Sequence, residues 1–176
     1  MGITTKTGDQ GQTSLYSGER VWKDDLRVDA YGCLDELDAH LGDALHLVQD
    51  PAANSILAQL QAMLYRVMGQ LASPGAAYPY PVTETEVAEV TALIQSLEEQ
   101  TPLQGFVLPG SLPSSAKLDI CRTVARRAER QAVKLSRAEY VPPELLQYLN
   151  RLSDLLFILA RSLETKAGAI RYTPKP

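Results

Sequence analysis

Four arginines and one glutamate lie between Arg122 and Arg130, within one predicted helix. Arg122 and Arg126 are one helical turn apart and share a face, and Glu129 and Arg130 lie close to that face. Arginine presents a planar fork of donors that fits phosphate oxygens, and like charges one turn apart repel until an anion neutralises them. The run predicts a site for an anionic ligand such as a triphosphate; a solvated basic face is the alternative.

A second set of donors lies in residues 1–23, which are polar and rich in Gly, Thr and Ser. Gly8 and Gly11 can adopt positive φ angles, so that backbone N–H groups converge on an anion. Hydroxyls and lysines add donors and charge: Thr5, Lys6, Thr7, Thr13, Ser14 and Lys23. The Walker pattern is absent. We interpret the segment as an extended arm that binds phosphate; a disordered tail is the alternative.

Composition is that of a globular domain. The chain has 176 residues, 45% of them hydrophobic and 22% charged, enough for one domain with a substantial core. The formal net charge of -4 argues against nucleic acid as the main partner but permits a local site for a small anion. No segment is typical of a signal peptide or a membrane span, and the two cysteines fit reduced thiols, so a cytoplasmic location is expected.

Apolar residues spaced by three and four predict five helices, and capping residues and prolines delimit them. They cover about 24–50, 52–71, 83–99, 113–137 and 143–168, with Pro- and Gly-rich loops at 73–82 and 101–113. The predicted fold class is all-α: one domain over 1–176, with an arm at 1–23 and a five-helix bundle at 24–168.

Two further features leave alternatives open. Asp35 points away from the apolar stripe of the first helix, on a side whose small residues permit close approach of another subunit. Asp35 or Asp38 then pairs with an arginine of the fourth helix, or both are solvated. Phe106, in a Pro- and Gly-rich loop, either caps the end of the bundle or forms the wall of a binding pocket.

Six segments, taken in order, resemble the PduO-type ATP:cob(I)alamin adenosyltransferases: TKTGDQGQTSL, GERVWKDD, VDAYGCLDELDAHLG, FVLPG, CRTVARRAER and YLNRLSDLLFILAR. The resemblance covers nearly the whole chain. It implies a homotrimer of five-helix bundles that binds ATP, with Mg²⁺, at each subunit interface. It also implies transfer of the 5′-deoxyadenosyl group of ATP to cob(I)alamin, which yields adenosylcobalamin and triphosphate. Asp119 and Cys121 replace the family's usual His and Ala.

The resemblance also implies roles for individual residues. The nucleotide is expected to be wrapped by Thr5, Lys6, Thr7, Gly8, Thr13, Ser14 and Lys23 of the arm. The helical part of the ATP site comprises Arg126, Arg127, Ala128, Glu129, Arg130 and Asn150. Arg122 is expected to pair with Asp35 across the interface, and Phe106 to pack near the lower face of the corrin. The expected catalytic group is Arg126, Arg122, Asp35 and Glu129, and no side chains are assigned to a metal.

Cob(I)alamin is itself a strong nucleophile, so the protein need only orient C5′ of the ribose and stabilise the departing triphosphate. Expected partners are a reductase or an adenosylcobalamin-dependent enzyme, and neither nucleic acid nor membrane. A nucleotide- or cobalamin-binding protein without turnover is the second hypothesis. A di-iron bundle is set aside because neither His40 nor His46 has Glu three residues before it.

Overall fold

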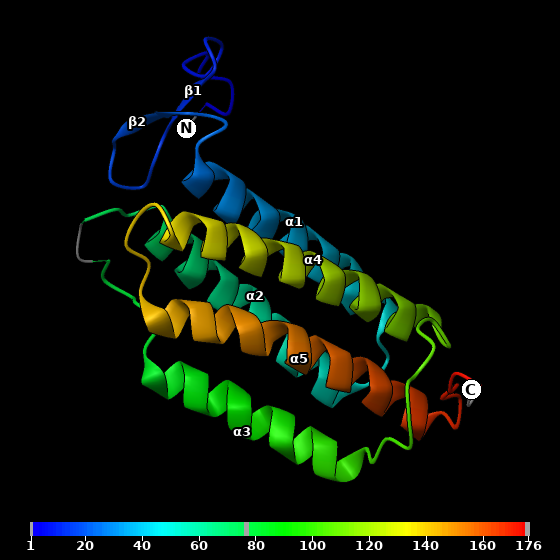
Figure 1. Cartoon of the computed structure of the whole chain (residues 1–176). Coiled ribbons are helices and arrows are strands. Elements are labelled where there is room, and N and C mark those ends of the chain that lie inside the picture. The colour runs from blue at the N-terminus through cyan, green and yellow to red at the C-terminus, as the bar shows by residue number, and fades with distance from the viewer. Residues whose placement is uncertain (1, 76–77, 175–176) are drawn as a thin grey trace.

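The computed structural model describes residues 2–75 and 78–174, which leaves residues 76 and 77 of the loop predicted at 73–82 outside the described part. Five helices form a bundle in these residues (Figure 1): α1 (Leu26–Leu47), α2 (Pro51–Leu71), α3 (Glu84–Gln100), α4 (Pro113–Ser136) and α5 (Pro143–Lys166). The all-α prediction is confirmed. Among the described helices, none combines the length and apolarity that a bilayer crossing requires.

Local signals explain where these helices begin and end. The side chain of Asp25 accepts the backbone N–H of Arg27 at 2.8 Å and caps α1. Asp50 caps α2 in the same way, with Pro51 in the first turn. Gly168 follows α5 with a φ of +61°, the left-handed conformation that commonly ends a helix. These residues explain the starts of α1 and α2 and the end of α5.

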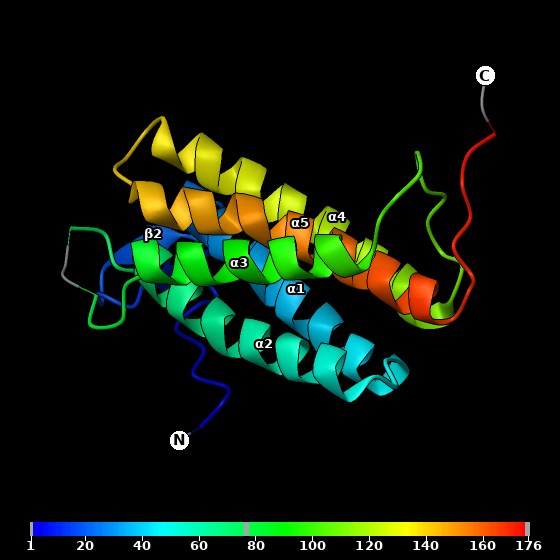
Figure 2. The same cartoon turned by 90° about the horizontal axis from the view of Figure 1, so that it is seen from below.

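Helix α4 packs against α1 on one side and α5 on the other, while α2 packs on α1 and α3 on α5 (Figures 1 and 2). The α4 face toward these neighbours includes Ala125, Ala128 and Ala132, all buried. Such small side chains let the helix axes approach closely, and leucines of α1 and α5 fill the remaining core. The apolar face of α4 is thereby fixed, and its arginines must lie on other faces.

The N-terminal arm forms a short antiparallel hairpin, β1 (Gln12–Ser14) and β2 (Arg20–Trp22), which extends beyond the start of α1 (Figure 1). The backbone N–H of Tyr16 donates to the carbonyl of Ala72, which attaches the hairpin to the end of α2. Leu15 beside it is buried. The arm is therefore a structured element in this chain, as the arm interpretation requires.

The start of α3 carries the capping box that the sequence predicts at Thr83 and Glu86. Glu86 accepts the Thr83 backbone N–H at 2.8 Å, and its other carboxylate oxygen accepts from Arg66 of α2 at 2.6 Å. Burial alone would raise the pKa of Glu86, but the hydrogen bonds from Thr83 and Arg66 lower it to about 2. The charged carboxylate therefore ties α3 to α2.

We expect Glu86→Gln to lower the free energy of unfolding by about 1 kcal/mol at neutral pH, because an ionic cap and an ion pair are lost. A folded-state pKa below the ordinary 4.5 stabilises the protein fully above that pH and loses its effect as pH falls toward 2. Urea unfolding of both proteins along a pH series measures this. A stability gap that stays constant down to the lowest pH would contradict the assignment.

Candidate active site

Helix α4 places Arg122 and Arg126 on the wall of a cavity of about 540 Å³ that lies between α3, α4 and α5. Arg126 and Arg130 are exposed, and Arg122 is half-buried. On the α5 side the cavity is also lined by Arg151 and Phe157. The carboxylates of Glu98 and Asp154 also line it, and Asp154 lies 3.8 Å from Arg151. The predicted arginine face thus borders a hollow that contains charges of both signs and an apolar wall.

Glu129 and Asn150 meet across the α4–α5 contact. The side-chain amide of Asn150 donates to Oε1 of Glu129 at 2.9 Å. Ala128, the neighbour of Glu129, is buried against the bundle and offers no side-chain donor. Glu129 and Asn150 lie 21 positions apart in the sequence, and both are predicted ligand contacts. The structure places the carboxylate of one beside the amide of the other.

The α1–α4 contact holds Arg127 differently from the other arginines. Its guanidinium donates to Glu36 of α1, an ion pair that the sequence did not predict. Asp35 is exposed, whereas Asp38 accepts from Gln61 of α2 at 2.9 Å and is thereby turned away from α4. Of the two aspartates considered as partners for an arginine, Asp35 alone remains directed outward and available to another subunit.

Arg122 is held within its own subunit by α4 and α5. Its Nε lies 3.4 Å from Oδ1 of Asp119, one turn earlier, and its guanidinium carbon lies 6.0 Å from the centre of the Phe157 ring. Aromatic faces attract such cations at this range. The ion pair and the ring contact leave the outer edge of the guanidinium, with its two terminal nitrogens, free for another partner in the described part of the chain.

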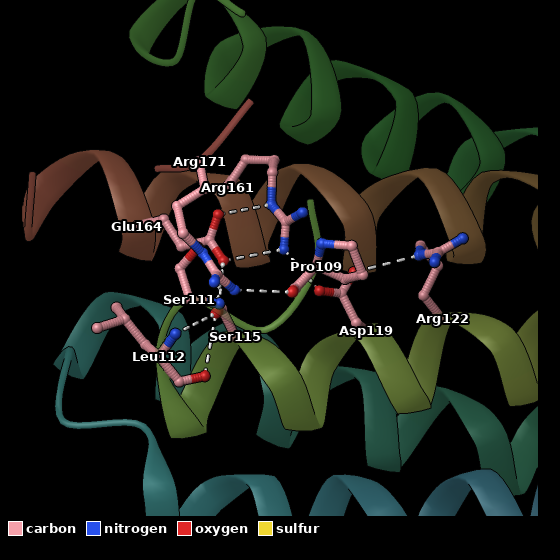
Figure 3. A network of polar contacts seen from close by, with 9 residues as sticks. All are labelled: Pro109, Ser111, Leu112, Ser115, Asp119, Arg122, Arg161, Glu164 and Arg171. Carbon is pink, nitrogen blue, oxygen red and sulfur yellow. Dashed lines mark hydrogen bonds and ion pairs between the residues drawn. The ribbon is translucent and has the colours of Figure 1, made fainter. Parts of the chain in front are cut away.

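Behind Arg122 lies a buried ion cluster formed by Asp119, Arg161 and Glu164 (Figure 3). The sequence did not predict this cluster, because the apolar spacing that indicates the helix does not identify the partners of Arg161. One signal was present: LLFILARSL is apolar on all sides apart from Arg161 and Ser162, and a charge in such a segment must be buried beside an opposite charge.

The arm gathers its donors around a polar hollow lined by Lys6, Thr7, Ser14 and Arg20, among others. Arg20, which was not predicted, donates to the Thr7 carbonyl at 2.8 Å and to Ser14 Oγ at 3.3 Å. Lys6 has a φ of 58°, an uncommon conformation for a residue with a side chain. Two hydroxyls and two cations thus line one hollow together with the carboxylate of Asp9, which gives the hollow a positive balance of charge.

Two further predicted arm residues have defined places. Gly8 lies against Lys23, since a Cβ built on that glycine would be 3.1 Å from the lysine Nζ. Thr5 Oγ1 and Thr7 Oγ1 are hydrogen-bonded at 2.9 Å, and Thr13 belongs to β1, paired with Val21. A Cβ at position 8 would require only a small shift of the flexible end of Lys23. Gly11 has the expected positive φ, +82°, whereas the expectation of a positive φ at Gly8 is wrong.

Phe106 is 86% exposed, so it does not cap the bundle core, and the capping alternative is wrong. Its loop is held by the C-terminal segment through a bridge between Val107 and Tyr172. The Phe106 carbonyl accepts the Thr173 N–H at 2.8 Å. A paired backbone therefore presents an aromatic ring to the surroundings, where a ligand or another subunit can cover it.

Nucleophilic and metal-binding groups are few around the arginine face. Burial raises the pKa of the Cys121 thiol to about 12, which leaves it protonated and unreactive at neutral pH. Within residues 2–75 and 78–174, no three His, Cys, Asp or Glu side chains gather as metal ligands. The arrangement can bind anions and orient a reactant.

The chain matches proteins of one family. The family model described as cobalamin adenosyltransferase matches residues 3–163. The corrinoid adenosyltransferase PduO of Citrobacter freundii is 40% identical over 167 residues, which cover 92% of this chain and 50% of that protein. The corrinoid adenosyltransferase of Bacillus subtilis is 40% identical over 173 residues, covering 96% of this chain and 89% of that protein. This chain therefore spans about half the length of the Citrobacter PduO protein.

Solved structures agree with this relationship. A phenylalanine-to-alanine variant of the PduO-type ATP:corrinoid adenosyltransferase from Lactobacillus reuteri, complexed with cobalamin and ATP, superposes with a TM-score of 0.93. It is 30% identical, and the match covers 99% of this chain and 100% of that one. An arginine-to-lysine variant of the same enzyme, complexed with ATP, gives a TM-score of 0.91 at 31% identity, covering 98% and 100% of the two chains. The chain belongs to the cobalamin adenosyltransferase family.

Proposed function

We propose that this protein is a corrinoid adenosyltransferase that moves the 5′-deoxyadenosyl group of ATP to cob(I)alamin or a related corrinoid. The observation that carries the proposal is the arginine face of α4 beside the Glu129–Asn150 pair and the cavity next to them. Relatives of this family have been solved with cobalamin and ATP. In the reaction, an electron pair on cobalt forms the bond to C5′ while the C5′–O bond breaks, and that bonding pair leaves with triphosphate.

Charge neutralisation is the main contribution of the α4 arginines. Arg126 and Arg130 are exposed and bind the triphosphate oxygens, where negative charge accumulates as the C5′–O bond breaks. Arg127 is neutralised by its ion pair with Glu36 and contributes less positive potential than Arg126 and Arg130 do. Glu129 and Asn150, which fix one another, orient the nucleoside end and so aim C5′ at the corrinoid.

Magnesium is proposed to arrive with the nucleotide. Mg²⁺ in nucleotide sites is held by substrate phosphates with one or two protein carboxylates. Glu129 is the carboxylate within the arginine run, and its Oε1 is already oriented by Asn150. This donor set fits an ion bound chiefly by phosphate and water, and the protein supplies the surrounding cations.

We propose that the active site forms between subunits of a homotrimer. In the described residues of one chain no hydrogen bond joins the arm to α4, although both carry phosphate donors. Asp35 is exposed on α1, and Arg122 keeps its terminal nitrogens free. In the trimer, the arm of one subunit lies over the α4 arginines of the next subunit, so the two sets of phosphate donors meet. Asp35 of one subunit then pairs with Arg122 of its neighbour.

Phe106 belongs to the same arrangement, since an exposed ring on a paired loop can pack against the lower face of a corrin. An apolar wall there excludes the lower axial ligand of cobalt, which makes reduction to cob(I)alamin easier.

We further propose one adenosyltransferase domain over residues 1–176, in the cytoplasm, where free thiols such as Cys33 and Cys121 persist. A reductase or an adenosylcobalamin-dependent enzyme is its proposed partner.

Arg126→Ala is expected to lower kcat by about 100- to 1000-fold, because a donor to the departing triphosphate is removed. Formation of adenosylcobalamin from ATP, Mg²⁺ and chemically reduced cobalamin, followed by absorbance, measures this. Arg137→Ala, at the C-terminal end of α4, is the matched control and is expected to keep wild-type kcat. Equal rates for Arg126→Ala and the wild type, with the oligomer intact in both, would remove Arg126 from the site.

Mg-ATP is expected to protect the arm from trypsin, which should cleave the free protein after the exposed residues Arg20 and Lys23. Saturating nucleotide should slow this cleavage by about 10-fold or more, since bound ligand depletes the open state. Cleavage after Arg137 serves as the internal reference, and Arg126→Ala should lose the protection. If the arm is cut equally fast with and without Mg-ATP, the arm does not close over the nucleotide.

A further inference from the structure

The buried ion cluster of Asp119, Arg161 and Glu164 lies between two parts of the proposed site (Figure 3). Arg161 is 1% exposed, and its Nη2 donates to Oδ2 of Asp119 at 2.7 Å. Its Nε lies 3.2 Å from Oε2 of Glu164. A guanidinium buried to this degree is stable only beside anionic partners. Arg161 and the two carboxylates therefore hold one another in place.

Asp119 uses its two oxygens for two different arginines. Oδ2 accepts from buried Arg161, and Oδ1 faces Nε of Arg122 at 3.4 Å. Because Arg161 fixes one oxygen, the carboxylate cannot turn away, and the other oxygen stays directed at Arg122. The Phe157 ring reinforces this arrangement, with its centre 5.3 Å from the Arg161 guanidinium carbon and 6.0 Å from that of Arg122.

Glu164 connects the cluster to the loop that carries Phe106. Its Oε1 accepts from the Ser115 hydroxyl at 2.7 Å and from the backbone N–H of Ser111 at 3.3 Å. Ser115 Oγ in turn accepts the backbone N–H of Leu112 at the start of α4. Arg171 donates to Ser111 Oγ at 3.0 Å from the other side. The cluster is therefore held at its Glu164 end by Ser111 and Ser115, and at its Asp119 end by the contact with Arg122.

We propose that Asp119 and Arg161 are positioning residues for adenosyl transfer: Arg161 fixes Asp119, and Asp119 sets the orientation of the Arg122 guanidinium. Held through Nε, Arg122 presents its terminal nitrogens to the neighbouring subunit and to the cavity. Neither Asp119 nor Arg161 lines the cavity itself. The inference rests on the proposed function, since it concerns how an arginine of that site acquires its orientation.

A double-mutant cycle tests the link. Asp119→Asn and Arg122→Ala are each expected to lower kcat by about 10- to 100-fold, because a misplaced arginine no longer serves the reaction. The two changes together should cost no more than Arg122→Ala alone, since the effect of Asp119 passes through Arg122. Losses that multiply, or wild-type kcat in Asp119→Asn, would overturn the proposal.

Two companion variants separate positioning from stability. Asp119→Asn/Arg161→Met removes one buried charge of each sign, and the remaining carboxylate of Glu164 keeps its hydrogen bonds from the Ser115 hydroxyl and the Ser111 N–H. It should show the same loss of kcat and the same coupling to Arg122→Ala. Glu86→Gln, at the α2–α3 ion pair, is the control: it should lower the thermal midpoint, keep wild-type kcat and show no coupling. Wild-type kcat in the folded double variant would also overturn the proposal.

A readout without turnover distinguishes this inference from the proposed function. The Nε–H resonance of Arg122, assigned by its loss in Arg122→Lys, should exchange slowly with water in the wild type. It should shift and exchange faster in Asp119→Asn and in the double variant. Absence of adenosyl transfer in the wild type would sink the proposed function alone. An Arg122 resonance unchanged by loss of Asp119 would sink the positioning role alone.

Discussion

The packing of α4 between α1 and α5 is the constraint on which the site depends. A helix that buries small residues such as Ala125, Ala128 and Ala132 on one side has no room there for long side chains. Its arginines therefore occupy the remaining faces. Arg127 obtains Glu36 and Arg122 obtains Asp119, while Arg126 and Arg130 remain exposed. This unbalanced positive face suits a polyanionic substrate.

Hydrogen bonds that cross between helices then give the charges fixed positions. Asn150 of α5 orients Glu129, and Arg161 of the same helix holds Asp119 behind Arg122. Helix α5 is thus the support on which the α4 site is aligned, and its second half is buried almost all round. Buried ion pairs of this kind contribute little net stability compared with apolar packing, but they define one geometry, which a transfer reaction requires.

Local chemistry made much of the fold predictable. Asp25, Asp50 and the Thr83–Glu86 box mark helix starts because a capping side chain bonds to backbone groups two or three residues away. The arginine face followed from helical spacing alone. ATP, cobalamin and the trimer came from family resemblance, because residue spacing specifies a charge pattern and leaves the identity of the ligand open.

Contacts between distant residues were the part that could not be predicted. Arg161 meets Asp119 across 42 positions, and Arg127 meets Glu36 across 91, so no periodicity in either helix reveals the pairing. The contacts of Arg20 with Thr7 and Ser14 could not be predicted, because they depend on the register of the β1–β2 hairpin. The exposure of Phe106 likewise depends on Tyr172, which fixes its loop from the far end of the chain.

The central claim is that the site is complete only between subunits, with the arm of one chain over the arginines of another. The most direct measurement combines two variants that are each expected to be inactive, Arg126→Ala and Lys6→Ala/Lys23→Ala, by co-expression into shared oligomers. Random assembly places an intact arm over intact arginines in about one quarter of the interfaces, so about a quarter of wild-type adenosyl transfer should return. If the mixed oligomers stay as inactive as their parents, each site is built within one chain and the account is contradicted.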